Sequence, residues 1–232
     1  MDAPNNNPQL EGIYIHHLDL RDVLSKIELS FEIKFEEDFY PVEMTIHEVT
    51  EIVLSRLDKK PTKDRTAIAF FFRFRKVLIE RYGFSKNAIT PTTDLAVVFP
   101  NRSRKKRIKE VEQALGIQTN IVGANAGPIL LLILSIILSV IILFFTFFVG
   151  LGLLVVSLVA LKAVVYFGNA LYVNTVKEYV HRVIQSNYFQ ARKDTTTYNP
   201  DEVKRIIKDM FLEEIEIEGT DENILDRRIK IS

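Results

Sequence analysis

Residues 129–161 read ILLLILSIILSVIILFFTFFVGLGLLVVSLVAL, which is thirty-three consecutive positions without a charge. A single helix of that length would be about 50 Å long, whereas the hydrocarbon core of a bilayer is about 30 Å thick. Continuing past Lys162 to Val173 provides enough chain for two crossings of about 20 residues each. The stretch therefore predicts a hairpin of two membrane helices.

The two expected membrane helices lie near residues 128–149 and 152–173, because only helices satisfy their own backbone polar groups in lipid. Gly150 and Gly152 are expected to form the turn between them. The turn contains no polar residue, so the sequence leaves open whether the hairpin spans the membrane fully or is re-entrant. A buried helix pair in a soluble protein is disfavoured, since no other predicted surface of the chain is apolar enough to enclose it.

Lys162 and Asn169 are polar residues expected inside the second membrane helix. A lysine at the centre of a membrane helix costs about 3 kcal/mol, which the many Leu, Ile, Phe and Val residues, at about −0.3 to −0.6 kcal/mol each, outweigh. We expect Lys162 to extend toward the headgroups or to face the partner helix. A role in ion or proton transfer, as in a small oligomeric transporter or channel subunit, is the alternative.

Basic residues flank the apolar stretch on both sides, and all thirty acidic and thirty basic residues lie outside residues 113–161. The excess of Lys and Arg predicts that both flanks, and hence both termini, are cytoplasmic in a two-helix protein of the cell membrane. Because the formal net charge is zero, anionic lipid headgroups are favoured over nucleic acid as the partner. The residues expected at the membrane surface are Arg102, Arg104, Lys105, Lys106, Arg107 and Lys109. The basic residues after the hairpin, which support the same orientation, are Lys177, Arg182, Arg192 and Lys193.

The composition limits the other possibilities. The chain has no cysteine, so disulfides and thiolate metal sites are excluded, which is consistent with a reducing compartment. Residues 1–12 have neither a basic start nor an apolar core, so we expect a disordered N-terminus and no signal peptide.

Apolar residues recur at helical spacing on either side of the hairpin, so both flanks are expected to be bundles of short amphipathic helices. The expected organisation is a first helical unit at 13–57, a linker at 58–65, the first part of a second unit at 66–120, the hairpin at 121–173, the last helix of the second unit at 174–190, a linker at 191–199, and a C-terminal helix and tail at 200–232.

Two segments 130 residues apart share one pattern. Thr45 and Glu48 in TIHEVTEIVLSRL have the spacing of a helix-capping box, and so do Thr175 and Glu178 in TVKEYVHRVIQSN. A second, similar offset relates the segments that begin at Val77 and Ile206. Repetition at one period indicates a duplicated unit.

Three segments resemble parts of an acyl carrier protein. FRKVLIERYGFSKNAITPTTDLAVVFP is similar to the first helix and the I-T-P-x-T-x-L loop of that family, and HLDLRDVLSKIELSFEIKFEEDFYPVEMTIHEVTEIVLSRL is similar to the later part of the domain. EVKRIIKDMFLEEIEIEGTDENILDRRIKIS, at the C-terminus, again resembles a first helix and loop. The resemblance implies one carrier-like unit interrupted by the hairpin, from 66–116 and 175–186, and one permuted copy, from 13–57 and 200–232.

In acyl carrier proteins a serine carries phosphopantetheine. The corresponding position is His17 in the permuted copy, which cannot accept the group by the same chemistry, and falls near Ser103 in the interrupted unit. Ser103 is surrounded by basic residues, whereas carriers present acidic ones, and Ser232 lacks the helix that would present it. We therefore expect no cofactor, with Ser103 as the candidate to test.

Catalytic motifs are scarce. His17 and Asp22 have the H-x4-D spacing that resembles membrane glycerolipid acyltransferases, in which the aspartate orients a histidine base. The glycine and arginine blocks that should follow are missing. His47 lacks the second histidine of a zinc-binding helix, and no phosphate-binding glycine loop is present.

These observations predict a mainly α-helical, membrane-anchored binding or scaffold protein that is not a catalyst. The expected partners are the lipid bilayer and other membrane-bound proteins, with enzymes of lipid or acyl metabolism as the class that the resemblance implies. An acyltransferase using His17 and Asp22 is the enzymatic alternative, and a homo-oligomer is left open.

Overall fold

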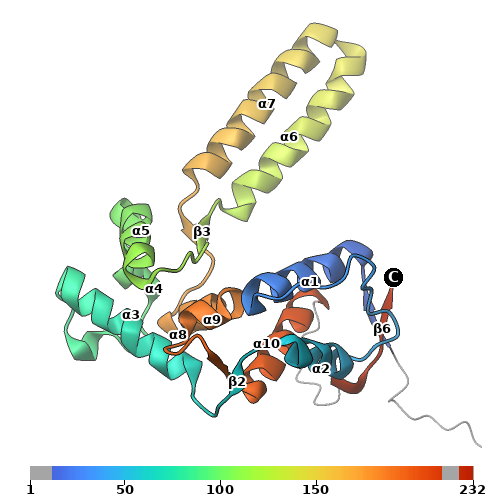
Figure 1. The fold of residues 1–232 in the computed structure, drawn as a ribbon. Coiled ribbons are helices and arrows are strands. Elements are labelled where there is room, and N and C mark those ends of the chain that lie inside the picture. The colour runs from blue at the N-terminus through green and yellow to red at the C-terminus, as the bar shows by residue number, and fades with distance from the viewer. Residues whose placement is uncertain (1–11, 216–224, 232) are drawn as a thin grey trace, which may run out of the picture. The chain divides into compact units, whose positions relative to one another are not determined.

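A computed structural model describes residues 12–215 and 225–231, and in these ranges the chain is mainly helical (Figure 1). The expected disorder of the N-terminus and the candidate Ser232 fall outside the described residues, apart from Gly12. The elements are, in order, β1 (Ile13–Ile15), α1 (His17–Phe31), α2 (Ile46–Arg56), β2 (Lys60–Pro61), α3 (Thr66–Tyr82), η2 (Lys86–Ala88), α4 (Leu95–Val98), η3 (Asn101–Ser103), α5 (Arg104–Leu115), β3 (Val122–Gly123), α6 (Ala126–Phe145), α7 (Phe147–Phe167), β4 (Ala170–Leu171), α8 (Val176–Ser186), α9 (Tyr188–Ala191), β5 (Thr197–Tyr198), α10 (Pro200–Ile215) and β6 (Ile229–Ile231).

The chain divides into two compact units. Unit 1 contains the described residues up to Phe74 and from Val180 onward, and unit 2 contains Arg75–Tyr179. The division falls inside helices α3 and α8. The hairpin therefore belongs wholly to unit 2.

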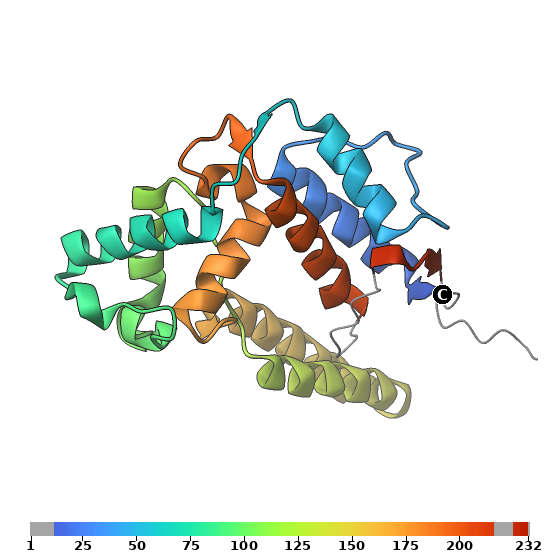
Figure 2. The same ribbon diagram turned by 90° about the horizontal axis from the view of Figure 1, so that it is seen from below.

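Unit 1 is built around helix α10, which packs against both α1 and α2 (Figure 2). Its apolar stripe is buried, as the spacing predicts, and faces the buried stripe of α1. Strands β1 and β6 pair in parallel, with Ile13 opposite Ile229, so segments from the two ends of the sequence lie side by side. The buried side chains of these helices are Leu20, Val23, Leu24, Ile27 and Phe31 in α1 and Val203, Ile206, Ile207, Met210 and Phe211 in α10.

Unit 2 combines a helical core with the hairpin. The core side chains of α5 are Ile108, Val111 and Leu115. Helices α6 and α7 lie side by side, and their lower ends are joined by the antiparallel strands β3 and β4 (Figure 1). This pairing brings the start and the end of the hairpin to one point.

The two units contain the same loop-anchoring bonds. In unit 1 the Glu28 carboxylate accepts a hydrogen bond from the backbone N–H of Phe35 at 2.7 Å, and in unit 2 the Glu112 carboxylate accepts one from Thr119 at 2.7 Å. The residue after each helix has a left-handed backbone conformation, with φ of 52° at Glu32 and 71° at Gly116. Helix α1 and the η3–α5 segment therefore correspond, at an offset of 84 residues.

The segments that close the two units also correspond. Thr45 forms an antiparallel bridge with Arg228 in unit 1, and Thr175 forms one with Asp94 in unit 2. The bridging hydrogen bonds are Ile229 N–H to Met44 O at 2.8 Å and Leu95 N–H to Asn174 O at 2.7 Å. The two units thus make equivalent bonds, but the paired segments occur in a different order along the sequence. In unit 1 the segment that pairs with Thr45 comes later in the chain, from residues 225–231, whereas in unit 2 the segment that pairs with Thr175 comes earlier.

Candidate functional site

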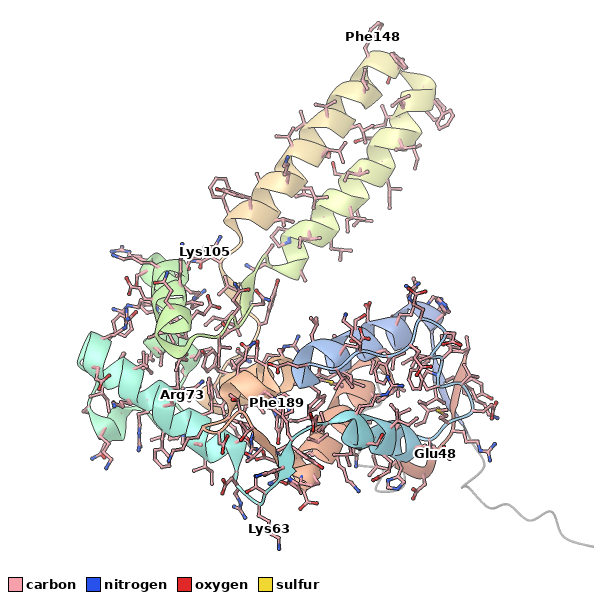
Figure 3. The ribbon with its side chains drawn as sticks, viewed as in Figure 1. Glu48, Lys63, Arg73, Lys105, Phe148 and Phe189 are labelled. Carbon is pink, nitrogen blue, oxygen red and sulfur yellow. The ribbon has the colours of Figure 1, made fainter. Side chains whose placement is uncertain are left out.

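Helices α6 and α7 contain 20 and 21 residues, so each is about 30 Å long and matches the thickness of a hydrocarbon core. Both are long and apolar enough to cross a membrane. Their large apolar side chains are mostly exposed, and Phe148, at the tip, is 86% exposed (Figure 3). The core helices of unit 1 bury such side chains, whereas these two helices present them to the surroundings.

The prediction that Gly150 and Gly152 form the turn is wrong. Both lie inside α7, and Thr146 alone separates the two helices. A Cβ at Gly150 would lie 2.5 Å from the Cα of Leu143, so this glycine allows the helices to approach next to the turn, whereas a Cβ at Gly152 would meet nothing within 4 Å. Glycine at a close helix contact and glycine in a turn look alike in a sequence.

Small polar residues fill the rest of the interface between α6 and α7. The hydroxyls of Ser135 and Ser157 lie 2.8 Å apart, and the Ser139 hydroxyl donates to the Ser135 carbonyl at 2.6 Å. Ser139 and Ser157 are buried. Hydrogen bonds between small side chains are typical of packed membrane helices. Here the Ser135–Ser157 bond links α6 to α7, whereas the Ser139 bond lies within α6.

The expected membrane-surface residues are on one short helical segment. Its exposed cations have i, i+3, i+4 and i+7 spacing and therefore share a face, while the core residues of α5 lie on the other side. Arg104 and Arg107 are half-buried. We call the exposed cations the basic face, which consists of Arg102, Lys105, Lys106 and Lys109.

The basic face is attached to the end of α7. The Lys105 ammonium donates to the carbonyl of Tyr166 at 3.0 Å, and the Arg104 guanidinium donates to the carbonyl of Asn169. Because Tyr166 is in the last turn of α7, the Lys105 ammonium also complements the dipole of that helix. The Asn169 amide donates to the Asn101 side chain at 2.6 Å, which adds a third link. The base of the hairpin and the basic face thus form one structure.

The two polar residues predicted inside the membrane have different positions. Lys162 is in α7 and is exposed. Asn169 lies beyond α7, which ends at Phe167, so the expected helix to residue 173 is too long. After the helix the chain passes close to the backbone of Ala124, since a Cβ at Gly168 would lie 2.5 Å from the Ala124 N, and it then forms β4 at Ala170–Leu171.

The residues singled out for catalysis or modification do not form a site. His17 and Asp22 are five positions apart on α1, about 140° around the helix, and no hydrogen bond joins them among the described residues. The His17 ring instead lies 5.6 Å from the ring of Tyr40. Ser103 is half-exposed just before α5 and makes no capping hydrogen bond.

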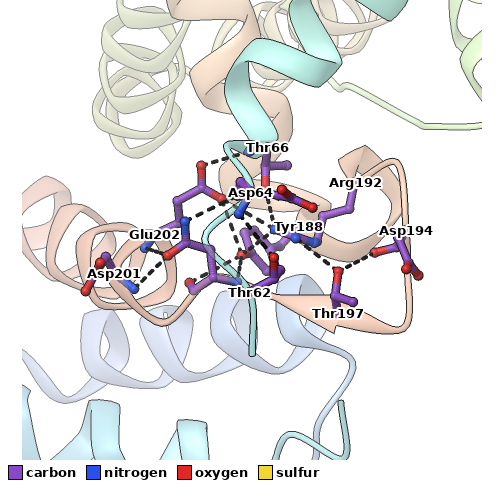
Figure 4. A network of polar contacts seen from close by, with 10 residues as sticks. Thr62, Asp64, Thr66, Tyr188, Arg192, Asp194, Thr197, Asp201 and Glu202 are labelled. Carbon is purple, nitrogen blue, oxygen red and sulfur yellow. Dashed lines mark hydrogen bonds and ion pairs between the residues drawn. The ribbon is translucent and has the colours of Figure 1, made fainter. Parts of the chain in front are cut away.

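A buried polar network in unit 1 was not predicted from the sequence (Figure 4). The Glu202 carboxylate accepts from the backbone N–H of Thr66 at 2.9 Å and lies 3.6 Å from the Arg192 guanidinium. Arg192 also donates to the hydroxyls of Thr66, at 2.7 Å, and Tyr188, at 3.1 Å. Burial raises the pKa of the Tyr188 hydroxyl. Arg192 is 4% exposed, so its charge is buried in this network.

This network joins residues that lie more than a hundred positions apart in the sequence. Its one local signal is the start of α10, where the Asn199 side chain accepts from the Asp201 backbone N–H at 3.0 Å, as expected for a cap before proline. Two shallow pockets of about 700 and 360 Å³ border the network. Since the carboxylate and guanidinium pair with each other, the network stabilises unit 1.

The shifted pKa values have structural causes. Burial and a 2.7 Å hydrogen bond to Glu110 raise the pKa of Tyr82 to about 12. Burial raises the pKa of Asp209, which lies 3.6 Å from His181. Within the described residues no group of three His, Asp or Glu side chains could hold a metal ion.

Comparison of the chain with protein-family models, with curated proteins and with solved structures found no match. The function is therefore argued from the hairpin and the basic face.

Proposed function

We propose that the protein is a membrane-anchored scaffold that acts by binding and not by catalysis. The hairpin crosses the bilayer, the basic face lies against anionic headgroups, and the helical units remain on the cytoplasmic side. The observation that supports this most directly is the bond from Lys105 to the Tyr166 carbonyl, since it puts the exposed cations at the level where the apolar helix ends.

The hairpin and the basic face have different roles in this proposal. Each basic residue near an anionic surface contributes about 1 kcal/mol, so the four exposed cations contribute about 4 kcal/mol together. Two uninterrupted apolar helices contribute far more. The hairpin is therefore the anchor, and the basic face orients the adjoining helix on the membrane.

The resemblance to acyl carrier proteins supports the choice of partners. Carrier domains work by docking onto enzymes, and two units with the same closing bonds offer two docking modules. His17 replaces the modified serine in one unit, and Ser103 in the other unit lies among basic residues instead of the acidic ones that carriers present, so the proposed modules bind without a prosthetic group. The proposed partners are membrane-bound proteins, with enzymes of lipid or acyl metabolism as the class to test first.

Membrane extraction tests the anchor. The full chain should stay in the membrane pellet after alkaline washing and be released by detergent. Leu138→Arg combined with Val156→Arg places two charges on exposed mid-helix positions, at about 3 kcal/mol each, and should raise the fraction of protein that alkaline washing removes from the membrane. The matched control adds two arginines at the exposed residues Asn87 and Thr195 and should stay in the pellet. A wild-type chain that is monodisperse in the supernatant without detergent would refute the proposal.

Single cysteines test the topology cleanly, because the chain has none. Cysteines at the exposed positions Asn87 and Gln113 should react with an impermeant reagent from one side, and Thr146→Cys, between the helices, from the other. Labelling of all three from one side would indicate a re-entrant hairpin.

A further inference from the structure

The corner between α5 and the end of α7 receives cations from two elements of unit 2. Lys105 extends from the basic face to the last turn of α7, where its ammonium lies 3.0 Å from the Tyr166 carbonyl. Lys162 is on α7 itself, four residues before Tyr166, and residues at that spacing are neighbours on one face of a helix. Lys162 and the exposed Tyr166 ring thus share one face of α7, and the Tyr166 carbonyl binds the Lys105 ammonium.

Lys162 is placed to reach the headgroups. It lies five residues before the end of α7, which is about 7.5 Å along the helix axis. A lysine so close to a membrane interface extends its ammonium out of the hydrocarbon while its methylene groups remain in it. Lys162 is exposed, so the hairpin does not block its side chain from extending toward the headgroups.

Neither ammonium has a carboxylate partner in the part of the chain that the structure describes. Lys105 bonds only a neutral carbonyl, and no hydrogen bond or ion pair of Lys162 is present. Other lysines differ: Lys106 on the same face lies 4.0 Å from Glu110, and Lys204 lies 2.9 Å from Glu51. The corner is therefore a local excess of two positive charges at the proposed membrane surface.

We infer that this corner binds the phosphate of one anionic phospholipid, with the Lys105 and Lys162 ammonium groups as donors and the Tyr166 ring beside the glycerol region. The inference rests on the proposed function, because a lipid reaches the corner only when the hairpin is embedded in a bilayer or in a lipid-containing micelle. A zwitterionic headgroup fits less well, since its own cation would meet the two ammonium groups.

Native mass spectrometry of the full chain tests this in micelles that contain equal amounts of phosphatidylglycerol and phosphatidylcholine. The wild type should retain phosphatidylglycerol preferentially. Lys105→Gln and Lys162→Gln should each lower the preference about fivefold, which corresponds to about 1 kcal/mol per basic residue. The charge-conserving variants Lys105→Arg and Lys162→Arg should keep most of it, and so establish that the fold is not the cause.

Lys106→Gln is the matched control, because it removes one exposed charge from the same helix but leaves the corner intact. It should change the preference less than twofold. An equal loss in all three glutamine variants, or no preference in the wild type, would overturn the specific site while leaving the anchored scaffold in place. Loss of membrane association by the wild type would instead refute the proposed function.

A competition experiment distinguishes a bound lipid from bound free phosphate. Millimolar inorganic phosphate should not reduce the retained phosphatidylglycerol, because the acyl chains hold the lipid against the hairpin. If phosphate competes fully, the corner is a site for the free anion and the lipid inference is wrong.

Discussion

Helix α1 in unit 1 and the η3–α5 segment in unit 2 correspond residue by residue but differ on their outer faces. Both bury apolar residues at three matching positions, and both end in the same anchored loop. The buried Leu20 and Val23 of α1, however, correspond to the half-buried Arg104 and Arg107. Their exposed positions differ in charge: Leu18, Arg21, Asp22 and Ser25 in α1 correspond to Arg102, Lys105, Lys106 and Lys109 in unit 2. The buried face thus maintains the shared architecture, and the outer face is basic only in the unit that contains the hairpin.

The largest expected effect is on the core. Phe31→Ala should destabilise unit 1 by about 3–5 kcal/mol, because Phe31 is 1% exposed and its ring lies 5.4 Å from that of Tyr188. Hydrogen exchange of the full chain in detergent should show faster exchange in α1, α2 and α10. Leu29→Ala, on the exposed side of α1, should change stability by less than about 0.5 kcal/mol.

Leu115 is the counterpart of Phe31 in α5, so Leu115→Ala should destabilise unit 2 by about 2–5 kcal/mol. The exchange of α10 in unit 1 should change little. If either substitution loosened both units equally, they would unfold as one body and the comparison would fail.

The next effect concerns the loop anchors. Glu112→Ala removes bonds to both the backbone N–H and the hydroxyl of Thr119, each at 2.7 Å, whereas Glu28→Ala removes one backbone bond. Bonds to a charged group contribute about 1.5–3 kcal/mol, so we expect the larger loss in unit 2. Denaturant unfolding of the two variants measures the difference, and an equal loss would mean that the Thr119 hydroxyl adds nothing.

The caps should have a smaller effect, which is the same in both units. Thr45→Ala and Thr175→Ala each remove a side-chain acceptor for the backbone N–H three residues later, at 3.1 and 3.2 Å. The expected loss is about 1 kcal/mol each, and serine at either position should restore most of it. Hydrogen exchange at the start of α2 and α8 reports it.

The smallest effect is a pH dependence. Backbone hydrogen bonds, from Thr45 and from Asn174 respectively, hold the pKa values of Glu48 and Glu178 below the ordinary value of 4.5. Because the pKa of each carboxyl is lower in the folded state, the stability that the two ionised carboxylates contribute is fully present above pH 4.5. It is lost as the pH falls through the lowered pKa. Glu48→Gln combined with Glu178→Gln should flatten the acid side of the stability curve, whereas Glu37→Gln, an exposed carboxylate, should not.

The sequence predicted the features that depend on local patterns. The two apolar helices, the capping threonines and the stripe of α10 follow from spacing alone. The turn was misplaced, because Gly150 serves a contact with Leu143 and not a bend. The pairing of Arg192 with Glu202 was not predicted, because the two residues meet only when the segments that contain them are packed. Composition cannot distinguish a paired cation from a free one.

The pairing of β1 with β6 sets an order of events during synthesis. Ile13 emerges from the ribosome early, but its partner Ile229 emerges only after the whole hairpin has been made. We expect the hairpin to engage the insertion machinery while unit 1 still lacks its closing strand. Until β6 has been synthesised, the amino-terminal helices lack the strand that pairs with β1.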